Sequence, residues 1–381
     1  MNRKILLFFT TILFSMASTF AQGGTTGPLV WELNDGTLTI SGEGEMPDYE
    51  LDNKAPWYAY AQFINTVVIE NGVKSIGNYA FYTSFLIYKF NSVTLPNSIT
   101  NIGDYAFCLC TELSSIDLPN SLISIGTASF GYCTSLTSVI IPNSVIVIGS
   151  HAFFNCTSLI SINVESENNV YASLNGVLFN KGKNILICCP AGKAGAYLIP
   201  SSVTNIGEFA FSDCSSLISV TLPNSITNIG KEAFSSCTNL TSITNLNSVP
   251  INISHLSVFV FINISECTLN VPVASILDYK NADIWKEFNI VGIEVGIETI
   301  VSDNVKIYPN PTTDELKIES GELKIENITI FDTYGRILKV ESRKQNVERE
   351  ILINISELPT GAYFLQITTD GGEVVRKVLK E

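Results

Sequence analysis

Few residues of this chain are of the types that carry out catalysis. The sequence of 381 residues contains two histidines, His151 and His255. A histidine near a serine, a cysteine or a carboxylate would indicate acid–base or nucleophilic catalysis. Neither histidine has such a neighbour at a spacing that recurs in catalytic sites. We therefore expect no catalytic residue and a protein that is not an enzyme.

The nine cysteines suggest either metal binding or disulfides. A zinc site would need CxxC pairs with further cysteines or histidines, and no such pair occurs. Five cysteines recur at one place in a repeat, where their Cβ atoms would point the same way and stay too far apart for disulfides. We expect buried thiols, no metal and no cofactor. Cys108 with Cys110, and Cys188 with Cys189, remain candidate exceptions.

A repeat of 23 residues must position these cysteines. Five clean copies begin at residues 95, 118, 141, 199 and 222, and a degenerate copy begins near Ile69. Each copy runs from a proline turn through "IG", "AF", Cys and Leu to alternating apolar and polar residues. This pattern predicts a turn, one helical turn and one short strand per coil. The period is typical of leucine-rich repeats, in which coils stack because none buries enough surface alone.

Three columns of the repeat predict the packing. We expect the glycines to need positive φ or close backbone approach, and the phenylalanines to form a stacked spine. The cysteines follow three residues after the phenylalanines. The members are Gly77, Gly103, Gly126, Gly149, Gly207 and Gly230; Phe81, Phe107, Phe130, Phe153, Phe211 and Phe234; Cys110, Cys133, Cys156, Cys214 and Cys237.

The first residues predict export. Arg3 and Lys4 precede the apolar stretch "ILLFFTTILFSMA", and small residues favour cleavage between Ala21 and Gln22. A single membrane anchor is the alternative, but the apolar run is short for a bilayer. We find no later stretch that is apolar enough for a stable transmembrane segment.

Composition and period divide the rest of the chain into five parts. Charged residues number 24 in the last 78 positions, against 34 in the first 303, so a boundary is expected before residue 304. The break in period after Asn163 predicts an inserted hairpin. The expected parts after the signal peptide (1–21) are an N-terminal cap (22–68), a solenoid (69–249) with the insertion at about 164–198, a C-terminal cap (250–292), a linker (293–303) and a final domain (304–381).

The repeat unit and its flanks resemble one family. The motif "LPNSITNIGDYAFCLC", the earlier "LTISGEGEMPDY" and the later "VPVASILDYKNADIWKEF" are similar to BspA-type leucine-rich-repeat proteins over roughly residues 27–292. This resemblance implies a curved, exported solenoid that attaches to other proteins or cells. The expected fold class is thus a leucine-rich-repeat solenoid followed by a small all-β immunoglobulin-like sandwich.

The last domain resembles the C-terminal sorting domain of the type IX secretion system. The similarity rests on "YPNP", "DTYGR", "LPTGAYFLQI" and "RKVLK". It implies a contact with the type IX translocon and placement outside a Gram-negative cell or on its outer membrane. A plain β-sandwich with an ordinary binding role is the alternative. The matching positions are Tyr308, Pro309, Asn310, Pro311, Gly335, Gly361, Tyr363 and Lys377.

The predicted strands offer a surface for a partner. The net charge of −14 argues against a nucleic-acid partner. One outward column is constant, at Ser115, Ser138, Ser161, Ser219 and Ser242. The neighbouring column varies, and we expect it to form the contact surface with the hairpin lysines, although these positions could equally be merely solvated. The candidates are Asp117, Ile140, Asn163, Thr221, Thr244, Lys181 and Lys183.

The predicted function is protein–protein contact or adhesion by a secreted or surface repeat protein, with a host or bacterial surface protein as partner. A carbohydrate-binding or scaffold module of a surface assembly is the alternative. It would need an aromatic platform, whereas all three tryptophans fall in the expected caps. An enzyme of unknown type is disfavoured by the missing acid–base residues.

Overall fold

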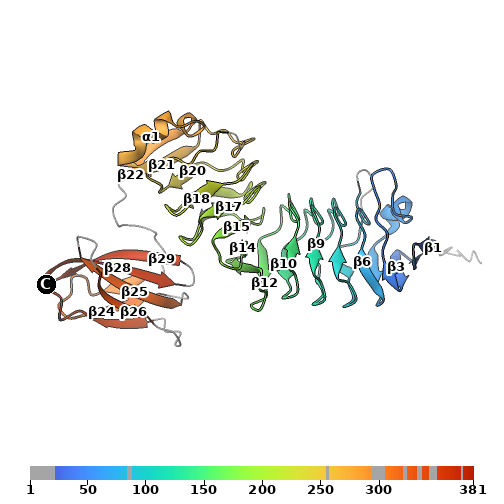
Figure 1. Cartoon of the computed structure of the whole chain (residues 1–381), viewed down its shortest axis with the longest axis horizontal. Helices are drawn as coiled ribbons and strands as arrows, with labels where there is room; N and C mark the ends of the chain where they lie inside the picture. Colours follow the sequence, from blue (N-terminus) through green and yellow to red (C-terminus); the bar gives the residue numbers. More distant parts are fainter. Residues whose placement is uncertain are drawn as a thin grey trace, which may run out of the picture.

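The computed structural model describes residues 22–83, 88–254, 257–293, 305–320, 324–332, 337–342, 350–369 and 372–381. Short strands stack along a solenoid, and a separate β-domain follows (Figure 1). This confirms the expected fold class. The signal-peptide residues up to Ala21 and the candidate residues His255 and Gly335 lie outside the described ranges.

The first part of the solenoid carries two five-stranded sheets and one pair of strands. One sheet has the order β1-β2-β3-β5-β7, and the other, β11-β9-β8-β6-β4, is parallel throughout. The elements are β1 (Gln22–Thr26), β2 (Leu29–Asn34), β3 (Thr37–Gly42), β4 (Gly44–Glu45), η1 (Tyr58–Phe63), β5 (Thr66–Ile69), β6 (Val73–Ile76), β7 (Val93–Thr94), β8 (Asn101–Ile102), β9 (Ser124–Ile125), β10 (Ser138–Ile141), β11 (Val147–Ile148) and β12 (Ser161–Val164), with β10 and β12 paired in parallel.

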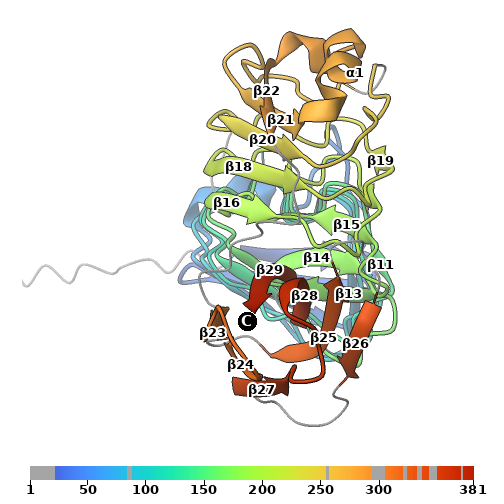
Figure 2. The ribbon, with the colours of Figure 1, turned by 90° about the vertical axis from the view of Figure 1, so that its left-hand side faces the viewer.

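The second part begins with the insertion and again carries two sheets, β13-β14-β15-β17-β19 and β16-β18-β20-β21-β22. Its elements are β13 (Tyr171–Leu174), β14 (Val177–Asn180), β15 (Ile185–Cys188), β16 (Gly195–Leu198), β17 (Asn205–Ile206), β18 (Leu217–Leu222), β19 (Asn228–Ile229), β20 (Ser242–Asn245), β21 (Thr268–Pro272), η2 (Val273–Ser275), α1 (Ile276–Asn281), η3 (Trp285–Glu287) and β22 (Asn289–Ile293). In Figure 2 the strands from β16 to β22 form one side of this part, and β15 and β19 lie toward the other.

The segment between the glycine and cysteine columns is not a helical turn, so that prediction is wrong. It consists of consecutive β-turns, with Ala106 N bonded to Gly103 O, Cys108 N to Tyr105 O and Cys110 N to Phe107 O. The intervening amides instead donate to the next coil, as Phe107 N does to Ser129 O at 2.7 Å. An α-helix would direct its amides to carbonyls four residues earlier in the same segment, whereas here alternate amides bond to the neighbouring coil.

The glycine column serves close approach rather than positive φ. A Cβ atom on Gly126 would lie 2.5 Å from the carbonyl carbon of Gly103, and one on Gly149 would lie 2.5 Å from the amide of Thr127. The positive φ angles fall two residues later, on Tyr105 (55°) and Phe209 (57°) among others. Of the two alternatives predicted for this column, close backbone approach is therefore the one found. The contact between coils, and not the backbone conformation, selects glycine here.

The phenylalanine spine is confirmed, but it is interrupted once. Phe81, Phe107, Phe130 and Phe153 stack with centroid distances of 5.1–5.6 Å, and Phe211 and Phe234 continue at 4.8 Å. Tryptophans end the two spines, with Trp57 on Phe81 at 5.7 Å and Trp285 on Phe259 at 5.6 Å. Two buried clusters meet at the insertion, near Val177 and Leu178. The line of coils changes direction there (Figure 1).

The C-terminal domain has two antiparallel sheets, β23-β24-β27 and β26-β25-β28-β29. Both contribute to one core, with Leu316 and Ile318 from the first sheet and Leu365 and Ile367 from the second. The strands are β23 (Lys306–Tyr308), β24 (Glu315–Glu319), β25 (Ile325–Asp332), β26 (Ile337–Ser342), β27 (Glu350–Asn354), β28 (Gly361–Thr369) and β29 (Gly372–Lys380). Among the described residues, no helix has both the length and the apolar character needed to cross a bilayer.

Candidate binding surface

The predicted contact columns lie on the outer face of the longer strands. Parallel pairing of β10 with β12 puts Ile140 opposite Asn163, and pairing of β18 with β20 puts Thr221 opposite Thr244. Alternation along each strand turns these side chains outward while their neighbours are buried. Asp117 is exposed but lies outside any assigned strand. The predicted column thus consists of two pairs of adjacent residues, which lie in two different sheets, and the separate residue Asp117.

The hairpin lysines lie elsewhere. Lys181 and Lys183 occupy the turn between β14 and β15, and that hairpin extends the sheet of β17 and β19, not the sheet of β18 and β20. The Lys181 ammonium donates to the carbonyls of Ser166 (3.1 Å) and Asn168 (2.5 Å). The structure therefore does not bring the lysines and the variable column into one sheet.

Exposed isoleucines mark the strand face. Ile140 is 59% exposed, Ile160 is 61% exposed and Ile218 is 53% exposed, all among serine, threonine and asparagine side chains. Single exposed aliphatic residues are ordinary. Here, however, Ile140 lies in β10 and Ile160 directly precedes β12, the strand paired with β10, so successive coils each expose one isoleucine. We refer below to Ile140, Ile160, Asn163 and Ile218 as the strand-face patch.

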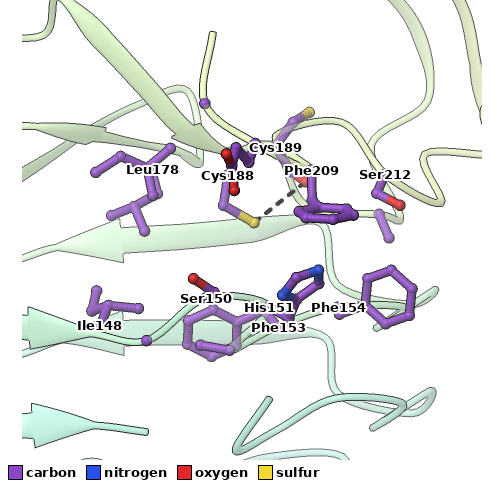
Figure 3. Close-up of a pocket in the computed structure, with 16 residues that line it drawn as sticks. Ile148, Ser150, His151, Phe153, Phe154, Leu178, Cys188, Cys189, Phe209 and Ser212 are labelled. Carbon is purple, nitrogen blue, oxygen red and sulfur yellow. Dashed lines mark hydrogen bonds between the residues drawn. The ribbon is translucent and has the colours of Figure 1, made fainter. Parts of the chain in front are cut away.

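A cleft opens where the insertion interrupts the spine. It has a volume of about 220 Å³ and lies between the coil of Ile148–Phe154 and the segments around Cys188 and Phe209. Figure 3 shows His151, Phe153 and Phe154 on one wall and Leu178, Cys188 and Phe209 on the other. The His151 and Phe209 rings meet across it with centroids 3.9 Å apart.

The ionisable groups of the cleft are poorly suited to catalysis. Burial lowers the pKa of His151, and its ring packs on Phe154 at 5.5 Å as well as on Phe209. Burial also raises the pKa of the Cys188 thiol, which opposes formation of a nucleophilic thiolate. Across the described ranges, no group of three or more His, Cys, Asp or Glu side chains is arranged to hold a metal ion.

The repeated cysteines are buried thiols. Four of the five donate a weak hydrogen bond to a phenylalanine carbonyl of the preceding coil, as Cys133 Sγ does to Phe107 O at 3.2 Å and Cys156 Sγ to Phe130 O at 3.0 Å. Cys214, which follows the insertion, instead donates to Cys189 O at 3.7 Å and Pro190 O at 3.6 Å. All nine cysteines are free in the structure, including Cys108, Cys110, Cys188 and Cys189. The thiol thus links successive coils without a covalent bond.

The predicted sorting residues gather around the last strand. The Asn310 side chain donates to Lys377 O at 3.0 Å and accepts from Leu379 N at 2.9 Å, so one side-chain amide bonds to two main-chain groups of β29. The peptide bonds before Pro309 and Pro311 are cis. Tyr308 donates to the Glu319 carboxylate, and Tyr363, two residues after Gly361, donates to Pro359 O. Lys377 is exposed.

The sequence predicts no site at Ser150, Phe154 or Phe209, which line the cleft. The available signal was the interval between Cys156 and Cys214, which is 58 residues where one period is 23. A coil that lacks the "AF" turn must leave the turns on either side without a neighbour.

Similar proteins of known structure are repeat proteins. A leucine-rich repeat protein from Eubacterium ventriosum is 27% identical, with a TM-score of 0.49, over 71% of this chain and 83% of that one. A leucine rich cell surface protein from Faecalibacterium prausnitzii is 22% identical, with a TM-score of 0.38, over 74% and 96%.

Two curated proteins show short similarities. An endo-acting ulvan lyase of Formosa agariphila is 23% identical over 111 residues, which are 29% of this chain and 21% of the lyase. An ulvan lyase of Nonlabens ulvanivorans is 24% identical over 99 residues, which are 26% and 18%. The chain spans about a fifth of the length of these curated relatives.

Family matches account for both folded parts. Residues 55–183 and 195–294 match the BspA type leucine rich repeat region in six copies, and residues 306–381 match the secretion system C-terminal sorting domain. The sorting domain confirms the expected location, outside a Gram-negative cell or on its surface. With more than half of its residues in the repeat match, the chain belongs to the BspA-type leucine-rich-repeat family and carries a secretion system C-terminal sorting domain.

Proposed function

We propose that this exported protein is not an enzyme and that its solenoid binds another protein through the strand-face patch. The observation that carries the proposal is the exposure of three isoleucines among mostly polar side chains: Ile140 (59%) in β10, Ile218 (53%) in β18 and Ile160 (61%) directly before β12. Removing such apolar area from water stabilises a complex by about 25 cal/mol per Å² before association costs. The partner proposed is a protein on a host or bacterial surface.

Adding positive charge to the patch tests the proposal. Replacing Ile140 and Asn163 by lysine puts two ammonium groups on adjacent paired strands without touching the core. We expect the purified protein to lose at least about tenfold in binding to immobilised extracellular-matrix proteins and to partner bacteria, since burying an unpaired charge is costly. Quantitative binding isotherms measure the effect.

A matched control lies on the other sheet of the same coils. Ile146 and Val147 are 54% and 50% exposed, so their double replacement by lysine adds the same charge to a comparable surface. We expect binding to stay within about twofold of wild type. Equal losses in both variants, or none in the patch variant, would remove the strand face from consideration.

Carbohydrate binding is the second candidate. A polar groove of about 520 Å³ runs along β4, β6, β8 and β9, and its lining includes Asp48, Asp104, Asn101 and Ser124. Carboxylates, amides and hydroxyls suit sugar hydroxyls, but none of the lining residues is aromatic. The curated lyases are named for the polysaccharide ulvan. Saturable binding of soluble ulvan would favour this candidate, and its depolymerisation would contradict the non-enzymatic proposal.

A further inference from the structure

The cleft at the insertion interrupts a hydrogen-bond ladder that otherwise joins every coil to the next. In the regular coils three alternate amides of one turn segment donate to three carbonyls of the next. Tyr105, Phe107 and Leu109 donate to Thr127, Ser129 and Gly131 at 2.7–2.8 Å, and Ala128, Phe130 and Tyr132 donate to Ser150, Ala152 and Phe154 at 2.8–3.0 Å. Beyond the cleft, Phe209, Phe211 and Asp213 donate to Lys231, Ala233 and Ser235.

At the cleft this ladder is interrupted on both sides. We call the two turn segments that border the gap, residues 151–155 and 208–212, the lips of the cleft. The equivalent amides of His151, Phe153 and Asn155 have no hydrogen-bond acceptor among the described residues. On the opposite lip, Ala210 O accepts from Cys189 N at 2.7 Å, whereas the carbonyls of Glu208 and Ser212 have no donor within the same described ranges. One lip therefore presents donors and the other acceptors.

These open groups need a partner. Phe153 is only 4% exposed and Ser212 only 8% exposed, so their main chain lies where an unpaired polar group is costly. The coil-to-coil interface is continuous on both sides, and a further segment of main chain would continue it. A peptide segment that adopts the turns of a regular coil has acceptor carbonyls on one side and donor amides on the other, so it can bond to two neighbours at once.

The cavity behind the lips suits an apolar side chain. Its volume of about 220 Å³ exceeds the roughly 150 Å³ known to hold one benzene ring. The walls include Phe153, Phe154, Leu178 and Phe209, and aromatic rings favour an aromatic guest. Figure 3 shows these side chains facing the same space from the two walls.

We propose that this cleft binds a peptide segment of a partner protein, which accepts hydrogen bonds from the amides of His151, Phe153 and Asn155, donates to the carbonyls of Glu208 and Ser212, and places an aromatic side chain in the cavity. The site is separate from the strand-face patch. The proposal of peptide binding in the cleft can therefore be tested independently of the proposal of adhesion through the strand-face patch.

Amide hydrogen exchange of the full mature chain tests the open ladder first. The amides of His151, Phe153 and Asn155 exchange much faster than those of Phe107 and its neighbours in the intact ladder. The probe is a synthetic heptapeptide, GTASFGY, which copies Gly126–Tyr132 and so carries the turn that the ladder lacks at the cleft. Added at millimolar concentration, it slows exchange at the three open amides and at no other turn.

Three variants distinguish binding at this site from non-specific apolar binding. Phe209→Ala removes one aromatic wall and weakens peptide binding about three- to tenfold. Tyr105→Ala changes the same column in an intact coil, where φ is 55° as against 57° at Phe209, and leaves binding unchanged. Ser150→Trp, which places an indole in the cleft from an exposed position, abolishes binding.

Selection from a displayed library of random heptapeptides tests the site without depending on GTASFGY as the probe. Binders that prefer the wild-type chain to Ser150→Trp, and that are enriched in aromatic residues, support the proposal. Protection of the three amides in the free protein would overturn it. So would failure of both GTASFGY and the library to yield binding sensitive to Ser150→Trp. A strand-face variant that loses adhesion but keeps GTASFGY binding separates the two proposals.

Discussion

At the scale of single residues, the repeated cysteine combines small size with a weak hydrogen-bond donor. Cys156 and Cys237 are fully buried and donate to the carbonyls of Phe130 and Phe211, both at 3.0 Å. An alanine would lose that contact, and a serine would place a more strongly hydrated hydroxyl there. An exported protein can keep these thiols reduced because oxidation requires access and a thiolate.

We predict that the thiols resist alkylation in the native state. Burial raises the pKa of Cys108 to about 11 and that of Cys156 to about 12, so the thiolate is scarce at pH 8. Iodoacetamide followed by intact mass measurement is expected to label at most one or two of the nine cysteines in native protein and all nine in guanidinium. Rapid native labelling at Cys156 would contradict the buried-thiol description.

The same shifts predict alkaline destabilisation. The folded pKa of these thiols lies above the unfolded value of about 8.5, so below pH 8.5 both states are protonated and the thiols add no pH dependence. Above it the unfolded chain loses protons first, and the free energy of unfolding falls by up to about 1.4 kcal/mol per pH unit for each thiol, up to about pH 12 for Cys156. Denaturant midpoints between pH 7 and 10 measure this slope, which should be shallower in Cys156→Ala.

At the scale of one coil, the fold depends on main chain packed against main chain. The glycine column lets each coil approach its neighbour, and alternate amides of the turn segment bond across that contact. The phenylalanines then stack at 5.1–5.6 Å in the first part of the solenoid. Coil spacing is thus set jointly by hydrogen bonds and by ring thickness.

We predict that one methyl group in this column is strongly destabilising. In Gly126→Ala the new Cβ would lie 2.5 Å from Gly103 C and 2.6 Å from Asp104 N, both main-chain atoms that cannot move alone. The expected loss is about 2–3 kcal/mol or more, seen as a lower thermal midpoint. Gly182→Ala is the control, because its nearest neighbour is the Asn184 side chain at 3.2 Å. Equal midpoints for the two variants would contradict the close-approach role.

At the scale of the whole molecule, a repeat solenoid is joined to a domain that directs export. The net charge of −14 argues against nucleic-acid partners. The solenoid itself has two distinct surfaces of interest, the strand-face patch and the cleft. The insertion that creates the cleft also divides the solenoid core into two clusters.

We predict that Asn310 is needed for export. Asn310→Ala removes two hydrogen bonds to the last strand, at Lys377 O and Leu379 N, and should destabilise that end of the domain by about 1–3 kcal/mol. The fraction of protein at the cell surface, measured by surface labelling, should fall, with accumulation inside the cell. Asn120→Ala, at an exposed solenoid turn, serves as the control. Normal surface levels of Asn310→Ala would contradict this role.

The repeat period, the stacking of Phe107 on Phe130 and the export domain could all be predicted from the sequence. Residues that recur at a constant interval must occupy equivalent places in stacked coils, so the columns alone specify the neighbours. The sorting motif "YPNP" likewise lies within a short segment and needs no distant context to be identified.

The tertiary structure alone decided the rest. Whether Gly126 serves conformation or close approach depends on Gly103 in another coil, and the placement of Lys181 and Lys183 depends on which sheet the hairpin joins. The open amide of His151 arises because its expected neighbour is missing, and a missing neighbour has no residue of its own in the sequence. Such features depend on contacts between coils, and contacts between coils exist only once the chain has stacked.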